Sequence, residues 1–250
     1  MSESESRGLR YGSDAPSGNA IDALIAGRKP EASVKTKTSR QGLATQAGDE
    51  RHSMMTDTAF YRKTTGQPDM VDSFHYNDEA GAKAMAEALG GGSKKRGTFS
   101  MAGGRLEVAL KATYGSPYER YEAGGKRIVI GSPGSSFQIQ LSNRTKHAVE
   151  VVASVDSLDV MDGKSASVKK RGYVIPAKSD LTIDGFRVNM ETVKQFVFGR
   201  VDESAAAKAG VARNVGVIGL AVYDEDEAQA KLARLAESQK RTAADPFSVR

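Results

Sequence analysis

The feature that most limits the fold of this chain is a series of short runs, within residues 105–223, in which apolar and polar side chains alternate. Phe137, Ile139 and Leu141, for example, are separated by two glutamines. An alternation of period two is the pattern of a β-strand that buries one face. Gly, Pro and Asn residues separate the runs at intervals of about 8–12 residues, which is typical of an antiparallel sandwich. We therefore predict a mainly β domain, either an antiparallel sandwich or a jelly-roll-like fold.

The clearest pair of predicted strands is a hairpin. The run that ends at Leu141 is followed by a polar stretch at 143–146 and then by a second alternating run, 149–155. Two such runs joined by a short polar loop are the pattern of a β-hairpin. We expect the apolar members of both runs to point into the core. They are Phe137, Ile139, Leu141, Val149, Val151 and Val155.

About a hundred residues of lower hydrophobicity precede these runs, and no period of 2 or 3.6 persists within residues 28–76. We therefore expect residues 1–98 to form a long, extended polar arm that is ordered only against a partner. The β-sandwich domain is expected at 99–223, and a C-terminal helix and tail at 224–250. The acidic residues at the start of that last segment suit the first turn of a helix.

Two short helices are expected within the arm, near 19–27 and 78–89. The first begins at Asn19, which can cap it, and ends at Gly27. The second is rich in alanine, which favours helix, and stops at three consecutive glycines, 90–92.

The apolar side chains of the arm are the candidate partner-docking residues. Three of them share one face of the 19–27 helix, which has only two turns and is too short to be stable alone. That face needs a surface, either on a neighbouring subunit or on the chain's own β domain. Farther along, scattered aromatic residues are spaced like contact points on an extended strap. The predicted docking set is Ile21, Leu24, Ile25, Phe60, Tyr61 and Phe74.

Motifs for catalysis and for ligand binding are incomplete. Residues 163–165 (Gly-Lys-Ser) resemble the end of a phosphate-binding loop, but Leu158 stands where that loop needs its first glycine. Asp156, Asp159 and Asp162 are three residues apart, whereas calcium loops place carboxylates at every second residue. A turn, or a weak surface cation site, fits this spacing better. We predict no catalytic, cofactor-binding or metal-binding residues and therefore no enzyme.

Composition narrows the classes of partner. The net charge of +5 is spread along the chain, and the basic triplets at 94–96 and 169–171 have no interleaved aromatic residues. Each triplet could meet phosphate or an acidic partner, but we expect no nucleic-acid partner. There is no cysteine and no apolar run of 18 residues, so we expect no disulfide and no membrane span. The N-terminus has no apolar signal segment, which predicts synthesis in the cytoplasm without a signal peptide.

Two stretches of the expected β domain carry further motifs. Residues 171–187 contain Arg-Gly-Tyr-Val-Ile-Pro and Ile-Asp-Gly-Phe-Arg, and residues 213–224 read Arg-Asn-Val-Gly-Val-Ile-Gly-Leu-Ala-Val-Tyr-Asp. Together they resemble segments of uncharacterised bacterial proteins with a predicted β-sandwich. The resemblance covers roughly residues 135–225 and leaves the arm unmatched. It implies a sandwich fold and no particular chemistry, because one fold hosts many functions.

Three functions compete at this point. The first is a non-enzymatic structural or assembly protein, in which a β-sandwich subunit is strapped by its arm to a larger particle, such as a phage virion. Its partners would be subunits of the same or a neighbouring kind. The second is a bacterial protein- or glycan-binding module with a flexible tail. The third is an enzyme of unrecognised class. The polar arm with its apolar contact points favours the first.

Overall fold

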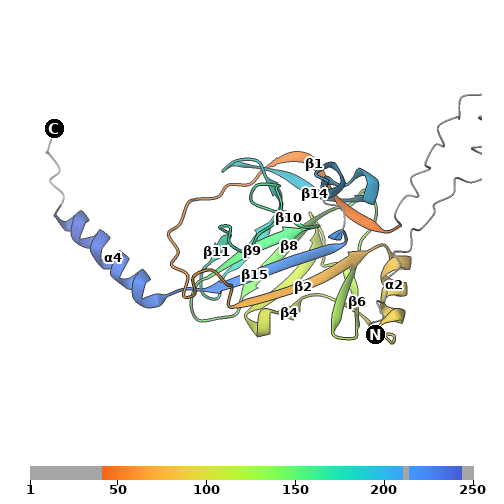
Figure 1. Cartoon of the computed structure of the whole chain (residues 1–250), viewed down its shortest axis with the longest axis horizontal. Coiled ribbons are helices and arrows are strands. Elements are labelled where there is room, and N and C mark those ends of the chain that lie inside the picture. The colour runs from red at the N-terminus through yellow and green to blue at the C-terminus, as the bar shows by residue number, and fades with distance from the viewer. Residues whose placement is uncertain (1–40, 211–213, 244–250) are drawn as a thin grey trace, which may run out of the picture. The chain divides into compact units, whose positions relative to one another are not determined.

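The computed structural model describes residues 41–210 and 214–243. The chain divides into two units, Met1–Thr38 and Ser39–Arg250, and all described residues lie in the second. Their strands form two sheets, of seven and eight strands (Figure 1). The predicted mainly β class is confirmed. The predicted helix at 19–27, with Ile21, Leu24 and Ile25, lies outside the described residues.

The first sheet has the strand order β1-β14-β8-β5-β4, and all of its pairs are antiparallel. Two short strands extend it, because β12 pairs with β8 and β13 pairs with β14. The bounds are β1 Leu43–His52, β14 Thr192–Arg200, β8 Ser136–Asn143, β5 Leu106–Ala112, β4 Phe99–Met101, β12 Asp180–Ile183 and β13 Gly185–Arg187.

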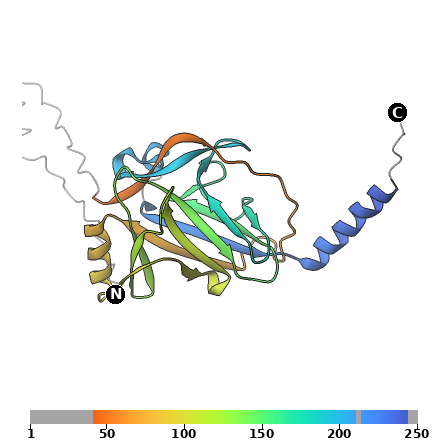
Figure 2. The ribbon, with the colours of Figure 1, turned by 180° about the vertical axis from the view of Figure 1, so that it is seen from behind.

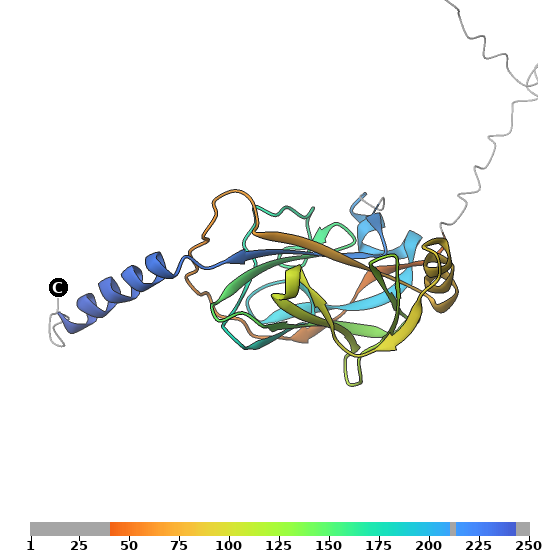
Figure 3. The ribbon, with the colours of Figure 1, turned by 90° about the horizontal axis from the view of Figure 1, so that it is seen from below.

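The second sheet has the order β10-β9-β15-β2-β7-β6-β3, and β11 pairs with β9. The bounds are β10 Leu158–Asp159, β9 Val149–Val155, β15 Val217–Asp224, β2 Met70–Asn77, β7 Lys126–Ile130, β6 Glu119–Ala123, β3 Ser93–Arg96 and β11 Tyr173–Ile175. Viewed from below, the β2–β15 pair and the β1–β14 pair lie in separate layers (Figure 3).

One pair departs from the predicted antiparallel pattern, because β2 and β7 run parallel. Parallel neighbours need a long crossover between them. Here the crossover contains helix α2 (Glu79–Ala88) and strands β3 to β6. Helix α2 packs its buried Ala82 and Ala86 against Ala123 and Ile128 of the sheet.

The remaining helices are short or terminal. They are the 3-10 helices η1 (Ala102–Gly104) and η2 (Val201–Glu203), α3 (Ala205–Lys208) and α4 (Glu227–Thr242). The caps of the two longer helices are those that their sequences favour. The Asp78 side chain accepts a hydrogen bond from the backbone N–H of Gly81, and Asp226 caps α4 in the same way. The predicted helices at 78–89 and after 224 are confirmed.

The two sheets, seen from behind in Figure 2, share one hydrophobic core. Phe137 of β8 lies at its centre, stacked against Phe196 and Phe198 of β14 with ring centroids 5.1 and 4.4 Å apart. The predicted hairpin is wrong, because β8 pairs within the first sheet and β9 within the second, so the polar loop between them carries the chain from one sheet to the other. The predicted inward face of each strand is confirmed, because all of its residues are buried. These residues are Phe137, Ile139, Leu141, Val149, Val151 and Val155, all 0% exposed.

Truncating Ile139 to Ala should lower the free energy of unfolding by about 2–5 kcal/mol, because β5 and β12 flank it and no solvent can fill the gap. Urea denaturation of both proteins measures this difference. Val188→Ala, at a residue 49% exposed, is the control and should change stability by less than about 0.5 kcal/mol. An equally small loss at Ile139 would contradict the assigned inward face.

The predicted boundary between arm and domain at residue 99 is wrong. Strands β1, β2 and β3 all precede it, and β2 lies in the middle of the second sheet, between β15 and β7. Leu43, Phe74 and Tyr76 belong to the core. Residues 43–98 are therefore part of the β body and not of an extended arm.

Candidate functional site

The segment between β1 and β2 crosses from one sheet to the other. We call residues 53–62 the strap (Figure 1, the brown loop). Near its start, the N–H of Met55 donates to the carbonyl of Met190, 2.9 Å away. At its end, the carbonyl of Tyr61 accepts from the N–H of Asp226 at 2.7 Å. Within the described chain, the backbone of residues 56–60 makes no backbone–backbone hydrogen bond. The backbone of the strap is thus hydrogen-bonded to other backbone groups near both ends, whereas its middle is held by side chains, such as the pair of Asp57 with Arg171.

A cleft of about 790 Å³ lies under the strap, and we call it the strap cleft. It runs along residues 172–174 and is closed on the far side by parts of β12 and β13. Among the described strands, β11 pairs only with β9, and β12 pairs only with β8. The cleft therefore lies between β11, which extends the second sheet from β9, and β12, which pairs with the interior strand β8 of the first sheet.

Arg187 forms the polar floor of the cleft and is only 8% exposed. Its Nε donates to the hydroxyl of Tyr173 at 3.1 Å, and its Nη1 donates to the carbonyl of Ser53 at 2.7 Å. The Ser53 hydroxyl in turn donates to Asp184 at 2.9 Å, and Gln138 also donates to that carboxylate. In the described chain, no carboxylate comes within ion-pair distance of Arg187. Arg187 Nη2 also donates to the Ser53 hydroxyl at 3.3 Å, so the Asp184 carboxylate lies one hydroxyl away from the guanidinium and forms no direct ion pair with it.

Tyr173 adds a hydrogen-bond donor to this floor. Burial raises the pKa of Tyr173, although the hydrogen bond from Arg187 opposes that shift. The hydroxyl therefore keeps its proton at neutral pH. It accepts from Arg187, and no acceptor for its own proton is found among the described residues. A ligand atom that accepts hydrogen bonds would complete this group.

The end of the strap is held by Arg62. Its Nε donates to a carboxylate oxygen of Glu150 at 2.6 Å, and its guanidinium lies 3.7 Å from the ring centre of Tyr223. The other carboxylate oxygen of Glu150 accepts from the N–H of Gly172 at 2.7 Å. One glutamate thus joins the strap to the start of β11.

Arg62→Met should lower the free energy of unfolding by about 2–4 kcal/mol, because it leaves Glu150 buried without its cation. The loss is smaller than for a fully buried pair, since the Arg62 side chain is 19% exposed. Amide exchange should also become faster in the strap. The matched control is Arg171→Met, whose pair with Asp57 is 73% and 74% exposed and should contribute less than about 1 kcal/mol. Equal losses in the two variants would contradict this role of Arg62.

Methionines line the rest of the cleft. Four of the eight methionines in the chain, Met54, Met55, Met161 and Met190, border it. Met54 is 70% exposed and Met190 is 44% exposed. Thioether side chains are flexible and polarisable, and they adapt to apolar groups of varied shape. The strap cleft can therefore receive apolar side chains above a basic floor.

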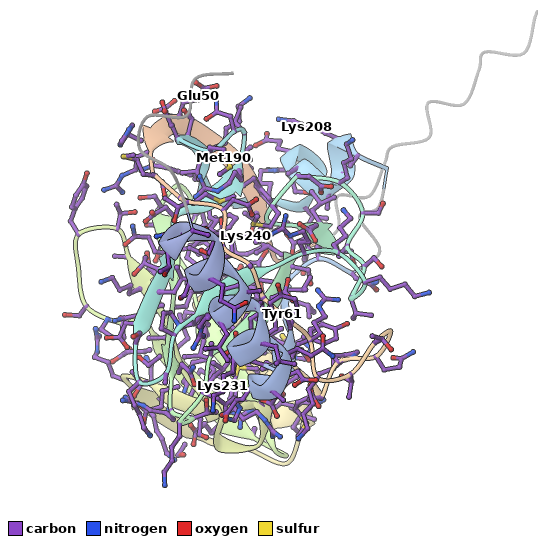
Figure 4. All side chains as sticks on the ribbon, turned by 90° about the vertical axis from the view of Figure 1, so that its left-hand side faces the viewer. Glu50, Tyr61, Met190, Lys208, Lys231 and Lys240 are labelled. Carbon is purple, nitrogen blue, oxygen red and sulfur yellow. The ribbon has the colours of Figure 1, made fainter. Side chains whose placement is uncertain are left out.

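A second hollow, of about 690 Å³, lies on the other side of the strap. Because side chains alternate along an extended chain, Phe60 and Arg62 line the strap cleft, while Ala59 and Tyr61 line this hollow with α4. Figure 4 looks onto α4 and shows Tyr61 beside it.

Helix α4 leaves its apolar stripe uncovered within the described residues. Only Ala230 of this helix is buried. Leu232 is 66% exposed and Leu235 is 52% exposed. We call the end of the β body where the strap meets α4 the strap end. With Met54, Leu232 and Leu235 it has several large exposed hydrophobic side chains, which is typical of surfaces that bind other proteins.

The structure separates the predicted docking residues. Phe60 lies on the strap, half-buried against Val152, Ala221 and Tyr223 of the second sheet. Tyr61 faces the hollow beside α4. The prediction for Phe74 is wrong: it is 0% exposed and packs edge-on against Phe99 in the core, 5.2 Å between ring centres. The sequence-based prediction missed Tyr173 and Arg187. A charged residue directly after Phe186 in a short apolar strand was the available signal.

The three aspartates of the suggested calcium loop do not converge. Asp156 is buried between the sheets, Asp159 is buried in β10, and Asp162 is exposed and paired with Lys170 at 2.8 Å. No group of three potential metal ligands occurs among residues 41–210 and 214–243. Gly163 has a φ of +65°, so the predicted turn at this point is confirmed.

No family model, no curated protein and no solved structure matches this chain. The resemblance of residues 135–225 to bacterial β-sandwich proteins therefore stays a prediction. Among the helices that the structure describes, none is both long and apolar enough to cross a membrane.

Proposed function

We propose that this protein is a non-enzymatic assembly subunit, a β-sandwich that binds neighbouring protein chains. The observation that carries this proposal is the group of exposed apolar side chains at the strap end. There a cleft lined by methionines adjoins a helix whose two leucines are more than half exposed. Such groups reduce solubility unless a partner covers them, so their presence in one region favours a binding surface.

The two connections of the β body lie at opposite ends of it. The N–H of Leu43 donates to Asn77 at 3.0 Å, so the described chain enters the body at the last residue of β2. Helix α4 leaves near the first residue of β2, because Met70 pairs with Val222 of β15. The eight residues of β2 separate the two points by about 25 Å.

This placement suits contacts between unlike surfaces of neighbouring subunits. A head-to-tail contact repeats through an assembly and gives rings or filaments, whereas a two-fold contact stops at a dimer. We propose that the strap end is one of two such surfaces and that residues 1–40 contribute to the other. The predicted docking residues Ile21, Leu24 and Ile25 fall in that segment.

Sedimentation velocity of the full chain over a range of concentrations tests the assembly role. The wild-type chain should form complexes larger than a monomer, and Leu232→Asp with Leu235→Asp should sediment mainly as a monomer with an unchanged melting temperature. Tyr114→Asp is the control, because Tyr114 is 90% exposed on the turn after β5, where its ring contacts Arg51. A monomeric wild-type chain at every concentration would overturn this proposal.

The strap cleft also favours a second candidate function, a monomeric module that binds another protein. Sedimentation velocity of the chain, together with a peptide-binding measurement, separates the two functions. A module stays monomeric and still binds a peptide in the cleft, whereas an assembly subunit associates with its own kind.

A further inference from the structure

We propose that the strap cleft binds an extended, acidic peptide segment with apolar side chains, contributed by a partner protein. This inference rests on the proposed function and specifies the chemistry of the bound segment. Three observations support it: the open strand edge along the cleft, the excess of basic over acidic side chains in its lining, and the methionines that line it.

The open edge favours an extended backbone. Residues 172–174 line the cleft, and β11 has a strand neighbour on one side only among the described strands. An unpaired strand edge presents backbone N–H and C=O groups, to which a peptide can add as a further strand. Because β11 has three residues, the paired part of the peptide would be about 10 Å long.

The charges favour carboxylates on that peptide. Four basic side chains line the cleft, and two of them already have acidic partners, Arg62 with Glu150 and Arg171 with Asp57. In the described chain, no carboxylate forms an ion pair with the other two. They are Arg187, at the floor, and Lys169, which is exposed at the rim. A bound carboxylate would supply the missing charge, and the Tyr173 hydroxyl could donate to it.

The methionines favour apolar side chains between the carboxylates. Along an extended peptide, alternate side chains point to opposite sides. A sequence that alternates acidic and apolar residues would therefore place all its carboxylates on one side and all its apolar groups on the other. The first side fits the basic groups of the cleft. The second fits Met54 and Met190, which are the most exposed of its methionines.

Binding can be measured by fluorescence anisotropy with the full chain and a labelled, end-capped peptide of the sequence Asp-Leu-Asp-Phe-Asp-Leu. We expect this peptide to bind and the charge-reversed peptide Lys-Leu-Lys-Phe-Lys-Leu to bind at least about tenfold more weakly. Asp-Ser-Asp-Ser-Asp-Ser, which keeps the charge and lacks the apolar groups, should also bind more weakly. Equal affinity for all three peptides would overturn the proposal.

Two exposed variants keep the test independent of folding. Lys169→Glu and Met54→Asp should each weaken binding of the acidic peptide by about tenfold, because each acts at the rim and supports no buried contact. The matched control is Lys208→Glu, at an exposed lysine on α3 outside the cleft (Figure 4). Unchanged affinity in the first two variants would overturn the proposal.

Methionine methyl NMR locates the bound peptide. The signals of Met54, Met161 and Met190 should shift on titration, while that of Met101, in the core at 1% exposure, should stay in place. Shifts elsewhere without these three would place the peptide at another site and overturn the inference. If the chain assembles but binds no acidic peptide, only this inference fails. If the peptide binds a chain that never assembles, the assembly role fails and the inference holds for a monomeric module.

Discussion

Removal of residues 1–104 should abolish cooperative folding of the rest of the chain. The deletion takes away four strands, among them β2, which lies between β15 and β7 in the second sheet. It also removes five large side chains from the core. They are Leu43, Phe74, Tyr76, Phe99 and Met101. At about 1.5–3 kcal/mol each, their burial contributes about 7–15 kcal/mol, which equals the whole stability of a typical domain.

The measurement is far-UV circular dichroism with thermal melting of the fragment 105–250. We expect no cooperative transition. The control is removal of Met1–Thr38, the first unit of the chain. It should leave the melting temperature of the β body unchanged, because all the described strands and the core that they form lie in Ser39–Arg250. If the fragment 105–250 melts cooperatively, then residues 105–250 fold independently and β1 to β4 are not needed for their folding.

The parts of the fold that the sequence predicts are those that depend on local pattern. Strands β8 and β9 are each marked by an alternating run, both within 20 consecutive residues, 136–155. The predicted hairpin between them is wrong because their pairing depends on distant strands, which place them in different sheets. Helices α2 and α4 have their capping residues and helix-favouring composition within one segment each. These signals do not depend on distant parts of the chain, so they can be recognised in a single sequence.

Strands β1 and β2 cannot be recognised in this way, for a physical reason. β1 lies at the edge of its sheet, its pairing with β14 shifts register between Ala47 and Glu50, and only its first three residues are buried. A bulged edge strand has little need of regular alternation. In β2, only Phe74 and Tyr76 are fully buried, and its partner β15 is about 145 residues away. Nothing near β2 in the sequence indicates that it is a central strand.

The candidate site shows the same limit. Aromatic residues spaced as contact points did mark the strap at Phe60 and Tyr61, but Phe74 belongs to a strand that the sequence did not reveal. Most of the strap cleft is formed by three separate stretches, 53–62, 169–174 and 181–190, and Glu150 and Met161 complete its lining. A basic floor around Arg187 exists only because the fold brings these stretches together.

Asp156→Ala should destabilise the protein more than Ile139→Ala or Arg62→Met. The carboxylate lies between the two sheets and is 1% exposed. It accepts hydrogen bonds from the N–H of Thr45 in β1, the hydroxyl of Tyr76 in β2 and the N–H of Gly216 before β15, each at 2.7 Å. Its loss leaves three buried donors without an acceptor. At about 1–3 kcal/mol for each of the three donors, we expect a loss of about 3–9 kcal/mol.

Urea denaturation at neutral pH measures this loss. The control is Asp162→Ala, in the same loop region, because Asp162 is exposed and its pair with Lys170 should contribute less than about 1 kcal/mol. Tyr76→Phe should lose part of the same free energy, and the double variant should lose less than the sum of the two, since both residues take part in one hydrogen bond. Additive losses would mean that Asp156 and Tyr76 act separately.

The pH dependence of stability gives an independent view of the same carboxyl. Burial raises the pKa of Asp156 above 3.8, although the hydrogen bonds from Thr45 and Tyr76 oppose that shift. The folded state therefore holds this proton to a higher pH than the unfolded state does. Between 3.8 and the pKa in the folded state, a rise in pH should lower the stability of the wild-type protein. Asn cannot titrate, so the stability advantage of wild type over Asp156→Asn should shrink as the pH rises through this window. An advantage that grows instead would mean that the hydrogen bonds outweigh burial and that Asp156 ties the two sheets together as a stabilised anion.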